Sequence, residues 1–342
     1  MKFLTGLLFG SLLSGLSGLS VVAARQDPAA ADPRPSFAEW LASVREEAIA
    51  RGLRPELVDE ALADVEEPLP IVLERDRSQA EAVLPLETYI SRRLTRSVIR
   101  TGRQKQDQHR TLLNQISVKY GVPPQVITAI WGLESNFGRF TGVRPTVPAL
   151  ATLAWDPRRA TLFRGELFSA LEILNRGDIA LANLKGSWAG AMGQPQFMPS
   201  SYLQFAEDFD GDGRRDIWHS SADVFASVAN YLKGHGWVAG ERWGREVHVS
   251  KELSARLAAD VPRREGRCRA TRDMSAPLPL ADWQQKGVRL GDGSSLPVAD
   301  RMASLVSGAS RHFLVYGNYD ALLEYNCAHA YALSVALLAD AL

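Results

Sequence analysis

Apolar side chains recur at spacings of three and four residues in the stretch YGVPPQVITAIWGLESNFG, residues 120–138. This period predicts an α-helix that opens near the two prolines and buries one face. The apolar positions on that face are Val126, Ile127, Ile130, Leu133 and Phe137. Glu134 follows Ile130 by four residues, so its carboxylate points close to the same face. A helix built to be buried therefore carries an ionisable group near its end.

Helical patterning also dominates the segments on both sides of this helix. The stretch SFAEWLASVREEAIARG begins with a capping box of Ser36 and Glu39 and ends at Gly52, a common helix stop. Pro55 opens another helix, and the chain to about residue 120 has mostly helical and charged patterning. From 121 to 237 shorter helices alternate with glycine-rich turns.

One region departs from the helical pattern. REVHVS at 245–250 alternates as a strand does, and residues 262–283 are rich in turn formers. Helical patterning returns in the last 24 residues, 319–342. We therefore expect a mainly α fold with a helical N-terminal subdomain at 25–107, a core at 108–239, a small β-containing insertion at 240–298 and C-terminal helices at 299–342 that complete the core and its cleft.

The chain begins with MKFLTGLLFGSLLSGLSGLSVVAA, one lysine and an apolar run that ends in small residues. This composition predicts a secretory signal peptide at 1–24, cleaved after Ala24. An uncleaved membrane anchor is the weaker alternative, because glycines and serines interrupt the run and no basic flank follows it. We expect the mature protein to be exported and soluble, with no membrane span.

The charge of the chain is balanced, with 39 basic and 39 acidic residues. Removal of the signal peptide takes away Lys2 alone and leaves 38 basic residues against 39 acidic ones. This balance gives no general attraction to nucleic acid or to an anionic membrane. The two cysteines, Cys268 and Cys327, predict one disulfide in an oxidising compartment, with two unrelated buried thiols as the alternative.

Two effects are expected to act on Glu134 at the end of its helix. Apolar neighbours and the negative end of the helix dipole both disfavour the carboxylate, so both raise its pKa. A carboxylic acid that keeps its proton near neutral pH is what glycosidic cleavage needs to protonate the leaving oxygen. The alternative is a glutamate held by local hydrogen bonds or facing solvent at a frayed helix end.

A second stretch, GSWAGAMGQPQFMPSSY at 186–202, combines small residues with aromatic and polar ones. The small residues would let the backbone approach a bulky ligand closely. Trp188 and Phe197 offer faces for sugar rings, while Ser187, Gln196 and Ser200 offer directional hydrogen bonds. Taken alone, the stretch is equally consistent with a tight loop before a helix that starts near residue 199.

Five stretches together resemble the motif series of the B-type lytic murein transglycosylases, in order and approximate spacing: WGLESNFGRFTG, GSWAGAMGQPQFMPSSY, DFDGDGRRDIW, SVANYLKGHGW and YNCAHAYALSV. The resemblance covers most of the chain after residue 24. It implies a lysozyme-like core and a periplasmic enzyme that cleaves the β-1,4 bond from N-acetylmuramic acid to N-acetylglucosamine in peptidoglycan. It also implies that Glu134 acts first as acid and then as base, so that 1,6-anhydromuramoyl ends form without a further cofactor.

The resemblance also assigns substrate-binding positions, one residue at a time. Ser187, Trp188 and Gln196 lie in the glycine-rich motif, and the other matching positions are Tyr231, Asn326, Tyr331 and, in less distinctive surroundings, Tyr89. Each tyrosine could instead be a buried aromatic residue with a satisfied hydroxyl. The family usually has a hydroxyl residue two positions after Asn326, where this chain has Ala328.

The stretch DFDGDGRRD, residues 208–216, fits the first positions of an EF-hand loop. Asp208, Asp210 and Asp212 would bind calcium with their side chains and Arg214 with its carbonyl. His219 occupies position twelve, where a bidentate glutamate is expected; the family pattern closes a longer loop with an aspartate that corresponds to Asp223. We expect a structural Ca²⁺ site, with an ion-free Asp/Gly turn as the alternative.

Two other functions remain open at this point. A hydrolytic muramidase would use water and a second carboxylate, such as Glu172 or Glu207. A non-catalytic protein of the cell-wall machinery would only bind glycan, but it has no need of a desolvated acid. We expect a monomer whose partner is the glycan strand of peptidoglycan.

Overall fold

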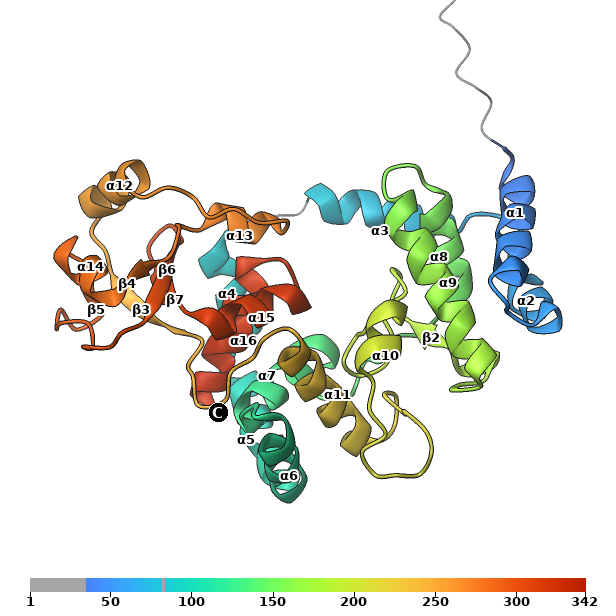
Figure 1. The fold of residues 1–342 in the computed structure, drawn as a ribbon, viewed down its shortest axis with the longest axis horizontal. Helices are drawn as coiled ribbons and strands as arrows, with labels where there is room; N and C mark the ends of the chain where they lie inside the picture. Colours follow the sequence, from blue (N-terminus) through green and yellow to red (C-terminus); the bar gives the residue numbers. More distant parts are fainter. Residues whose placement is uncertain (1–34, 82–83) are drawn as a thin grey trace, which may run out of the picture. The chain divides into compact units, whose positions relative to one another are not determined.

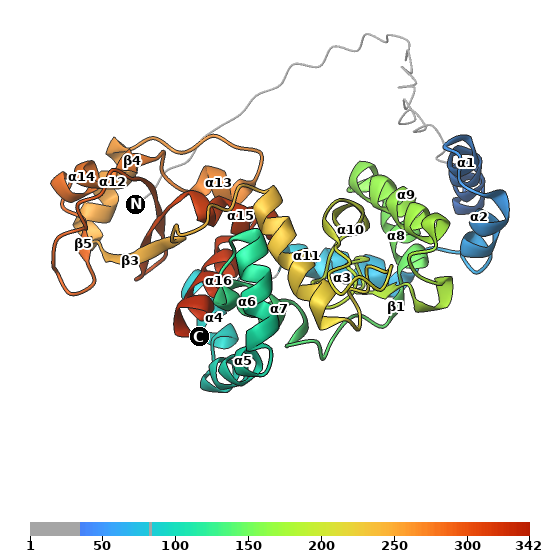
Figure 2. The ribbon, with the colours of Figure 1, turned by 60° about the horizontal axis from the view of Figure 1, so that its bottom comes forward.

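The computed structural model describes residues 35–81 and 84–342, so the predicted signal peptide at 1–24 lies outside the described residues. Residues 37–342 form one compact unit, and the following account concerns that unit. It is mainly helical, as predicted, with one small sheet (Figures 1 and 2). None of the described helices combines the length and apolar character that a membrane crossing requires.

The N-terminal part contains five helices. They are α1 (Phe37–Ala50), α2 (Pro55–Leu62), α3 (Pro70–Glu81), α4 (Leu86–Arg93) and α5 (Arg96–Gln108). Helix α1 ends just before Gly52, whose backbone is left-handed, and α2 opens with Pro55 at its first position. These helices do not pack only on one another: α1, α2 and α3 contact α8 or α9, whereas α4 packs on α16 and α5 on α7. The predicted subdomain 25–107 is therefore divided between two parts of the fold.

Helix α7 (Pro124–Ser135) lies at the centre of the packing. It contacts α5, α6 (Arg110–Tyr120), α11 (Ser221–Gly234) and α16 (His329–Ala341). Its residues from Val126 to Leu133 are all buried, and Ile127 and Ile130 have no exposed surface. The predicted apolar face is therefore confirmed, and α7 is covered on nearly every side.

A second group of helices carries the glycine-rich stretch. It consists of α8 (Thr146–Trp155), α9 (Ala160–Arg176), the short 3₁₀ helix η1 (Leu181–Asn183) and α10 (Pro199–Phe205). Helices α8 and α9 lie side by side (Figures 1 and 2). Strands β1 (Arg144–Pro145) and β2 (Lys185–Gly186) pair antiparallel at the start of the glycine-rich stretch.

The sheet has five antiparallel strands in the order β4-β6-β7-β3-β5. They are β3 (Gly244–His248), β4 (Leu278–Pro279), β5 (Arg289–Leu290), β6 (Met302–Ser307) and β7 (His312–Val315), with α12 (Lys251–Asp260), α13 (Arg269–Asp273) and α14 (Leu280–Gln285) between them. The hydrophobic core of this sheet includes Trp283, Val288 and Leu314, which have no exposed surface.

The sheet extends beyond the predicted insertion at 240–298, because β6 and β7 lie in the segment expected to be helical. Both strands are short and largely buried, and all four residues of β7 are buried. Burial on both faces removes the alternation of polar and apolar residues by which a strand is recognised. The helices after the sheet begin only at α15 (Gly317–Tyr325).

Candidate active site

The catalytic candidate Glu134 stands in the last turn of α7, where the helix ends abruptly. Asn136 and Phe137 both adopt left-handed backbone conformations, with φ of 51° and 58°. The Phe137 ring folds back onto the helix, so close that a Cβ at Gly132 would lie 2.6 Å from it. The Ser135 hydroxyl accepts the N–H of Gly138 at 3.0 Å. This termination holds the last turn, and with it Glu134, in one position.

Glu134 is half-buried at the end of α7. Burial raises its pKa from an ordinary value of 4.5 to about 7, while Tyr331 and the positive charge of Arg93 act in the opposite direction. The predicted rise in pKa is therefore present, and desolvation is its main cause. At neutral pH this carboxyl exchanges readily between its protonated and ionised forms.

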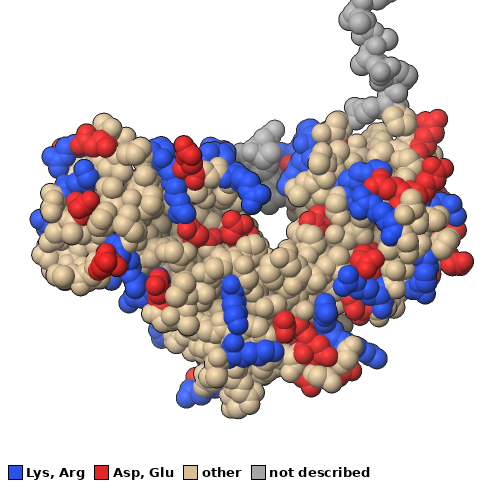
Figure 3. Space-filling model, viewed as in Figure 1, with Lys and Arg blue, Asp and Glu red and all other residues tan. Residues whose placement is uncertain are grey.

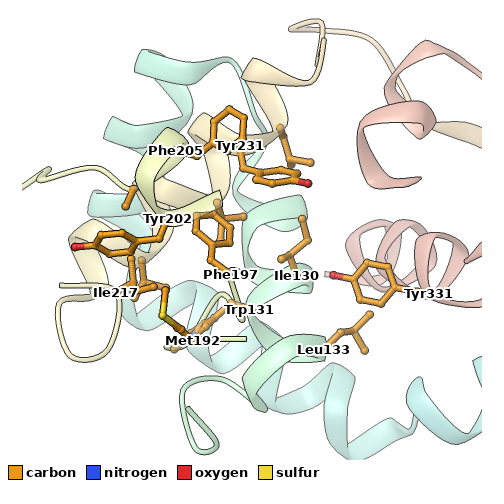
Figure 4. Close-up of a cluster of buried hydrophobic side chains, with 14 of the residues drawn as sticks. Ile130, Trp131, Leu133, Met192, Phe197, Tyr202, Phe205, Ile217, Tyr231 and Tyr331 are labelled. Atoms are coloured by element: carbon orange, nitrogen blue, oxygen red, sulfur yellow. The ribbon is translucent and has the colours of Figure 1, made fainter. Parts of the chain in front are cut away.

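Tyrosines from the C-terminal helices lie beside the Glu134 carboxyl. Tyr331 extends from α16 toward Ile130 and Leu133 of α7 (Figure 4). Burial raises the pKa of Tyr331, and the charge of Glu134 acts in the same direction. Although Tyr331 lowers the pKa of Glu134 as a hydrogen-bond donor would, its buried hydroxyl makes no hydrogen bond of ordinary geometry within the described residues. That hydroxyl is buried beside the Glu134 carboxyl.

Tyr325 is a second tyrosine beside Glu134, although the sequence analysis did not select it. Its ring stacks on that of Tyr331, with centroids 6.3 Å apart, and its hydroxyl donates to the carbonyl of Pro195 at 2.7 Å. Burial raises the pKa of Tyr325, and the charge of Glu134 acts in the same direction. Tyr231 packs on Tyr325 at 4.7 Å and donates to the carbonyl of Glu324, so it supports Tyr325 from behind.

Helix α4 contributes two residues from a segment remote in sequence. The Arg93 guanidinium donates to the carbonyl of Leu133, the residue before Glu134. Tyr89, one turn earlier on α4, lies close enough to Tyr331 to raise its pKa. The substrate-binding role of Tyr89 stays a prediction, whereas Arg93 had no sequence signal, since it sits in a helix rich in basic residues.

The glycine-rich stretch folds tightly on itself. The Ser187 hydroxyl accepts the N–H groups of Ala189 and Ala191, and the Gln196 amide donates to the carbonyl of Gly193 at 2.8 Å. A Cβ at Gly186 would lie 2.5 Å from the carbonyl oxygen of Ala191. At this position the absence of a side chain accommodates the chain itself rather than a ligand.

Two residues of this stretch do not lie where the sequence analysis expected. Phe197 is only 2% exposed and packs against Tyr231 in the core (Figure 4), so it offers no face to a sugar. The Ser200 hydroxyl donates to the buried carboxylate of Glu166 at 2.7 Å, which also accepts the Ser200 N–H at the start of α10. Trp188 is half-buried and remains a candidate for sugar contact.

Gln194 joins the glycine-rich stretch to α7, although no sequence pattern singled it out. Its side-chain oxygen accepts the indole N–H of Trp131 at 2.7 Å, and its side-chain nitrogen donates to the carbonyl of Trp218 at 2.8 Å. A buried amide with both ends paired fixes the geometry of its neighbours. Gln194 therefore aligns the stretch with the helix that carries Glu134.

The segment between α15 and α16 carries the remaining candidates. Asn326 is exposed, and its carbonyl accepts the N–H of Ala328 at 2.7 Å. Cys327, between them, forms a disulfide with Cys268, with Cα atoms 5.8 Å apart. The predicted pairing is present, and it connects this segment to the residue before α13.

The loop between α10 and α11 gathers acidic side chains, visible at the lower right of Figure 3. Carboxylate oxygens of Asp208, Asp210 and Asp212 lie within 4.8 Å of one another. The Asp208 carboxylate also accepts the N–H groups of Gly211, Asp212 and Gly213, the last at 2.9 Å, which bends the chain around it. Three hard oxygen donors in a tight loop fit a Ca²⁺ ion.

Asp223 is not a member of that group of three. It is fully buried, and its two oxygens accept the N–H groups of Phe209 and Asp216, each at 2.8 Å. Burial raises its pKa to about 6, and the charges of Asp210 and Asp208 act in the same direction. Arg214 donates its N–H to Asp212, and exposed His219 contacts Asp216. Asp223 thus connects the two ends of the loop by hydrogen bonds.

Comparison with known proteins agrees with this arrangement. The family described as Transglycosylase SLT domain matches residues 36–340. Membrane-bound lytic murein transglycosylase B of Escherichia coli (strain K12) is 48% identical over 137 residues, which is 40% of this chain and 38% of that protein. The match to this relative thus spans less than half of its length.

Solved structures match over most of the chain. SltB3 of Pseudomonas aeruginosa in complex with NAG-anhNAM-pentapeptide has a TM-score of 0.79 and 41% identity, covering 89% of this chain and 79% of that one. SltB1 of Pseudomonas aeruginosa, a soluble lytic transglycosylase, has a TM-score of 0.75, 30% identity and coverages of 90% and 98%. Escherichia coli Slt35 in complex with calcium has a TM-score of 0.73, 30% identity and coverages of 90% and 93%.

Proposed function

The chain belongs to the family of the transglycosylase SLT domain, and we propose that it is a lytic transglycosylase of peptidoglycan. It would cleave the β-1,4 bond between N-acetylmuramic acid and N-acetylglucosamine. The observation that carries this proposal is the carboxyl of Glu134, half-buried at the end of α7 with a pKa of about 7.

In the first step Glu134 donates its proton to the glycosidic oxygen as the bond from that oxygen to C1 of the muramoyl residue breaks. In the second step the Glu134 carboxylate takes the proton of the muramoyl C6 hydroxyl. The oxygen of that hydroxyl bonds to C1 at the same time. The products are a free 4-hydroxyl and a 1,6-anhydro ring, and no water is consumed. A group that acts in turn as acid and base works best when its pKa lies near the working pH.

The surrounding residues have supporting roles in this reaction. The buried hydroxyl of Tyr331 would steady the Glu134 carboxylate after proton transfer. Tyr89 and Asn326 would border the substrate, as would Ser187, Trp188 and Gln196 of the glycine-rich stretch, while Tyr231 would support Tyr325 from behind. Arg93 acts through Leu133 and keeps the pKa of Glu134 from rising further.

A hydrolytic muramidase is the less favoured alternative, because both candidates for a second carboxylate are engaged elsewhere. Glu172 pairs with Arg176 at 2.8 Å on α9. Glu207 accepts the hydroxyl of Tyr120 at 2.7 Å and the amide of Asn230 at 3.0 Å. Chemistry with a single carboxylate accounts better for the geometry around Glu134.

We propose a structural Ca²⁺ ion in the loop after α10. Asp208, Asp210 and Asp212 would hold it with their carboxylates, and Arg214 with its carbonyl, while Asp223 keeps the loop closed from within. The ion would neutralise three neighbouring negative charges and would take no part in cleavage. The calcium complex of Slt35 supports this proposal.

We also propose that the enzyme is exported to the periplasm by a signal peptide at 1–24 and acts there as a monomer. Its substrate, peptidoglycan, lies outside the cytoplasm. The disulfide between Cys268 and Cys327 is consistent with an oxidising compartment.

The decisive experiment is mass spectrometry of the fragments that the mature protein releases from purified peptidoglycan. Muropeptides one water lighter than hydrolytic products, with no reducing muramic end, are expected. Reducing ends would identify a muramidase instead. Binding without any release of fragments would favour a glycan-binding protein.

A further inference from the structure

A glutamate on α4 connects this helix to the β-sheet. The half-buried Glu87 carboxylate accepts the N–H group of Ser310 at 2.8 Å and that of Arg311 at 3.2 Å, both with the same oxygen, Oε1. These donors belong to the turn between β6 and β7, and Ser310 follows Glu87 by 223 residues. The steps proposed for cleavage do not use this contact directly.

The turn between β6 and β7 is shaped to hold a carboxylate. The N–H of Gly308 donates to the carbonyl of Arg311 at 2.8 Å, which closes the turn. Successive backbone N–H groups of a turn form a concave site for an anion. Burial disfavours the ionised form of Glu87, but hydrogen bonds from the N–H groups of residues 309–311 outweigh burial and lower its pKa. The turn therefore binds Glu87 as a carboxylate.

Gly308 shows how closely the carboxylate fits this turn. A Cβ at that position would lie 2.4 Å from Oε1 of Glu87, closer than any side chain tolerates. Glycine lets the backbone of the turn approach the carboxylate. The contact thus depends on both partners: an acceptor on α4 and a turn that has no side chain at its first residue.

Helix α4 also carries the two residues that reach the candidate active site from this part of the chain. Tyr89 and Arg93 follow Glu87 by two and six residues, and six residues of an α-helix span about 9 Å. The helix packs on α16, which carries Tyr331 (Figures 1 and 2). A displacement of α4 at Glu87 would therefore move Tyr89 and Arg93 as well, because so short a helix moves as one body.

The guanidinium of Arg93 has few contacts of its own. Among the described residues it donates to the carbonyl of Leu133 and forms no ion pair, and its buried Nε–H has no hydrogen bond. A guanidinium is held most firmly when it binds an acid in bidentate geometry, which Arg93 does not do. The placement of α4 therefore decides where this positive charge lies.

The position of that charge matters for Glu134. The groups that interact electrostatically with its carboxyl are Arg93 from α4, Tyr325 from α15 and Tyr331 from α16. Arg93 is the cation among these three, and it lowers the pKa of Glu134 against the effect of burial. The interaction between two charges weakens with distance, so a shift of Arg93 away from Glu134 would raise that pKa.

We propose that Glu87 is a positioning residue for cleavage, an inference that rests on the proposed function. By binding the turn between β6 and β7, Glu87 holds α4 so that Arg93 stays near Glu134 and Tyr89 stays near Tyr331. The sheet carries none of the catalytic candidates, yet through this contact it contributes to the electrostatics of the site.

The test uses three variants of the full chain. Glu87→Ala removes the carboxylate, and Gly308→Ala places a methyl group where its oxygen lies. Glu246→Ala is the matched control, because Glu246 of β3 binds the side chain of Arg311 at 2.7 Å and its loss disturbs the same turn without touching α4. The pH dependence of kcat for release of 1,6-anhydro ends from purified peptidoglycan is measured for each variant, and thermal unfolding checks that each one is folded.

Glu87→Ala and Gly308→Ala should each lower kcat roughly threefold, a smaller loss than that from Arg93→Met, because the guanidinium is displaced rather than removed. The alkaline limb of both profiles should move to higher pH, since the cation that lowers the pKa of Glu134 lies further away. Glu246→Ala should keep the wild-type kcat and profile. Glu87→Gln, whose amide oxygen can still accept both N–H groups, should restore both properties in part.

Combination with Arg93→Met separates positioning from a general loss of structure. If Glu87 acts through Arg93, adding Glu87→Ala to Arg93→Met should leave the alkaline limb where Arg93→Met alone puts it. A further shift in the double variant would overturn the proposal. So would unshifted profiles in both Glu87→Ala and Gly308→Ala, or an equal shift in Glu246→Ala.

A measurement that needs no cleavage distinguishes failure of this inference from failure of the proposed function. The carboxyl carbon of Glu134 can be followed by ¹³C NMR of glutamate-labelled protein, because its resonance is the one absent from Glu134→Gln. Wild-type protein that releases no anhydro ends would refute the proposed function alone. The titration midpoint of Glu134 should still be higher in Glu87→Ala than in the wild type, and an unchanged midpoint would overturn the positioning role.

Discussion

Glu134 and the aspartates of the loop after α10 are carboxylates in opposite surroundings. Glu134 is a single group, half-buried at the negative end of a buried helix, and its pKa rises to about 7. Asp208, Asp210 and Asp212 are three groups on a largely exposed loop, arranged by backbone N–H donors so that their oxygens face one another. Isolation from water raises the pKa of a carboxyl group and suits it to donating a proton. Grouping in water keeps carboxylates ionised and suits them to binding a cation.

The largest effect in this comparison is expected from Glu134→Gln. The amide keeps the shape of the side chain but can neither donate the proton nor accept it, so cleavage should fall by roughly a thousandfold or more. Binding of glycan strands should persist. Release of anhydro muropeptides and cosedimentation with peptidoglycan measure the two properties, and undiminished cleavage would remove Glu134 from the mechanism.

The same substitution should stabilise the fold in alkaline solution. The pKa of Glu134 is raised in the folded state, so its contribution to stability is fully present below pH 4.5 and is lost as pH rises through about 7. Glu134→Gln does not ionise and should exceed the wild type in free energy of unfolding by about 2 kcal/mol at pH 8 and match it at pH 4. Denaturant unfolding at both pH values measures this difference.

Glu265→Gln, at an exposed glutamate, is the control for that measurement. It should change the free energy of unfolding little at either pH. A stability difference between Glu134→Gln and the wild type that does not vary with pH would contradict the burial of an ionisable group at Glu134.

Arg93→Met should have an intermediate effect. It removes the donor to the Leu133 carbonyl and a positive charge that lowers the pKa of Glu134, so that pKa should rise. We expect about a tenfold loss in kcat, together with a shift of the alkaline limb of the pH–rate profile to higher pH. Arg93→Lys, which keeps the charge, should restore the pH profile more fully than the rate.

Arg92→Met is the matched control, because Arg92 is the exposed neighbour on α4. Its kcat and pH profile should equal those of the wild type. An Arg93→Met variant with lower kcat but an unshifted profile would mean that Arg93 only supports the fold.

Asp210→Asn should have the smallest effect on catalysis. It removes one of the three charges that would hold Ca²⁺, so the rise in Tm that millimolar CaCl₂ gives the wild type should be reduced or lost, while cleavage without added calcium stays within about twofold. Asp300→Asn, at an exposed aspartate outside the loop, should keep the full calcium response. An equal response of all three proteins would exclude calcium binding by this loop.

Local patterns were sufficient for the features that depend on residues close together in the chain. The period of residues 126–137 predicted both the buried face of α7 and the place of Glu134 on it, because the geometry of a helix fixes which residues share a face. The spacing of Asp208, Asp210 and Asp212 predicted their convergence for the same reason, since a tight turn brings alternate residues together.

The sequence was insufficient where burial on both faces removed the alternation of polar and apolar residues along a strand. It was also insufficient where one residue type suits several surroundings. Strands β6 and β7 were missed because neither face of β7 is exposed. Phe197 was expected to face a sugar and instead fills the core, since an aromatic residue beside glycines suits either place.

The sequence by itself thus determined helix α7 and the place of the catalytic candidate Glu134 in its last turn. Only the tertiary structure decided what surrounds that glutamate: Arg93 comes from α4, and Tyr325 and Tyr331 come from the C-terminal helices. It also decided that Gln194 joins the glycine-rich stretch to Trp131 of α7. The physical reason is that a pKa depends on the whole dielectric and charge environment of a group. That environment is assembled from segments separated by up to some two hundred residues along the chain, and no local pattern encodes their meeting.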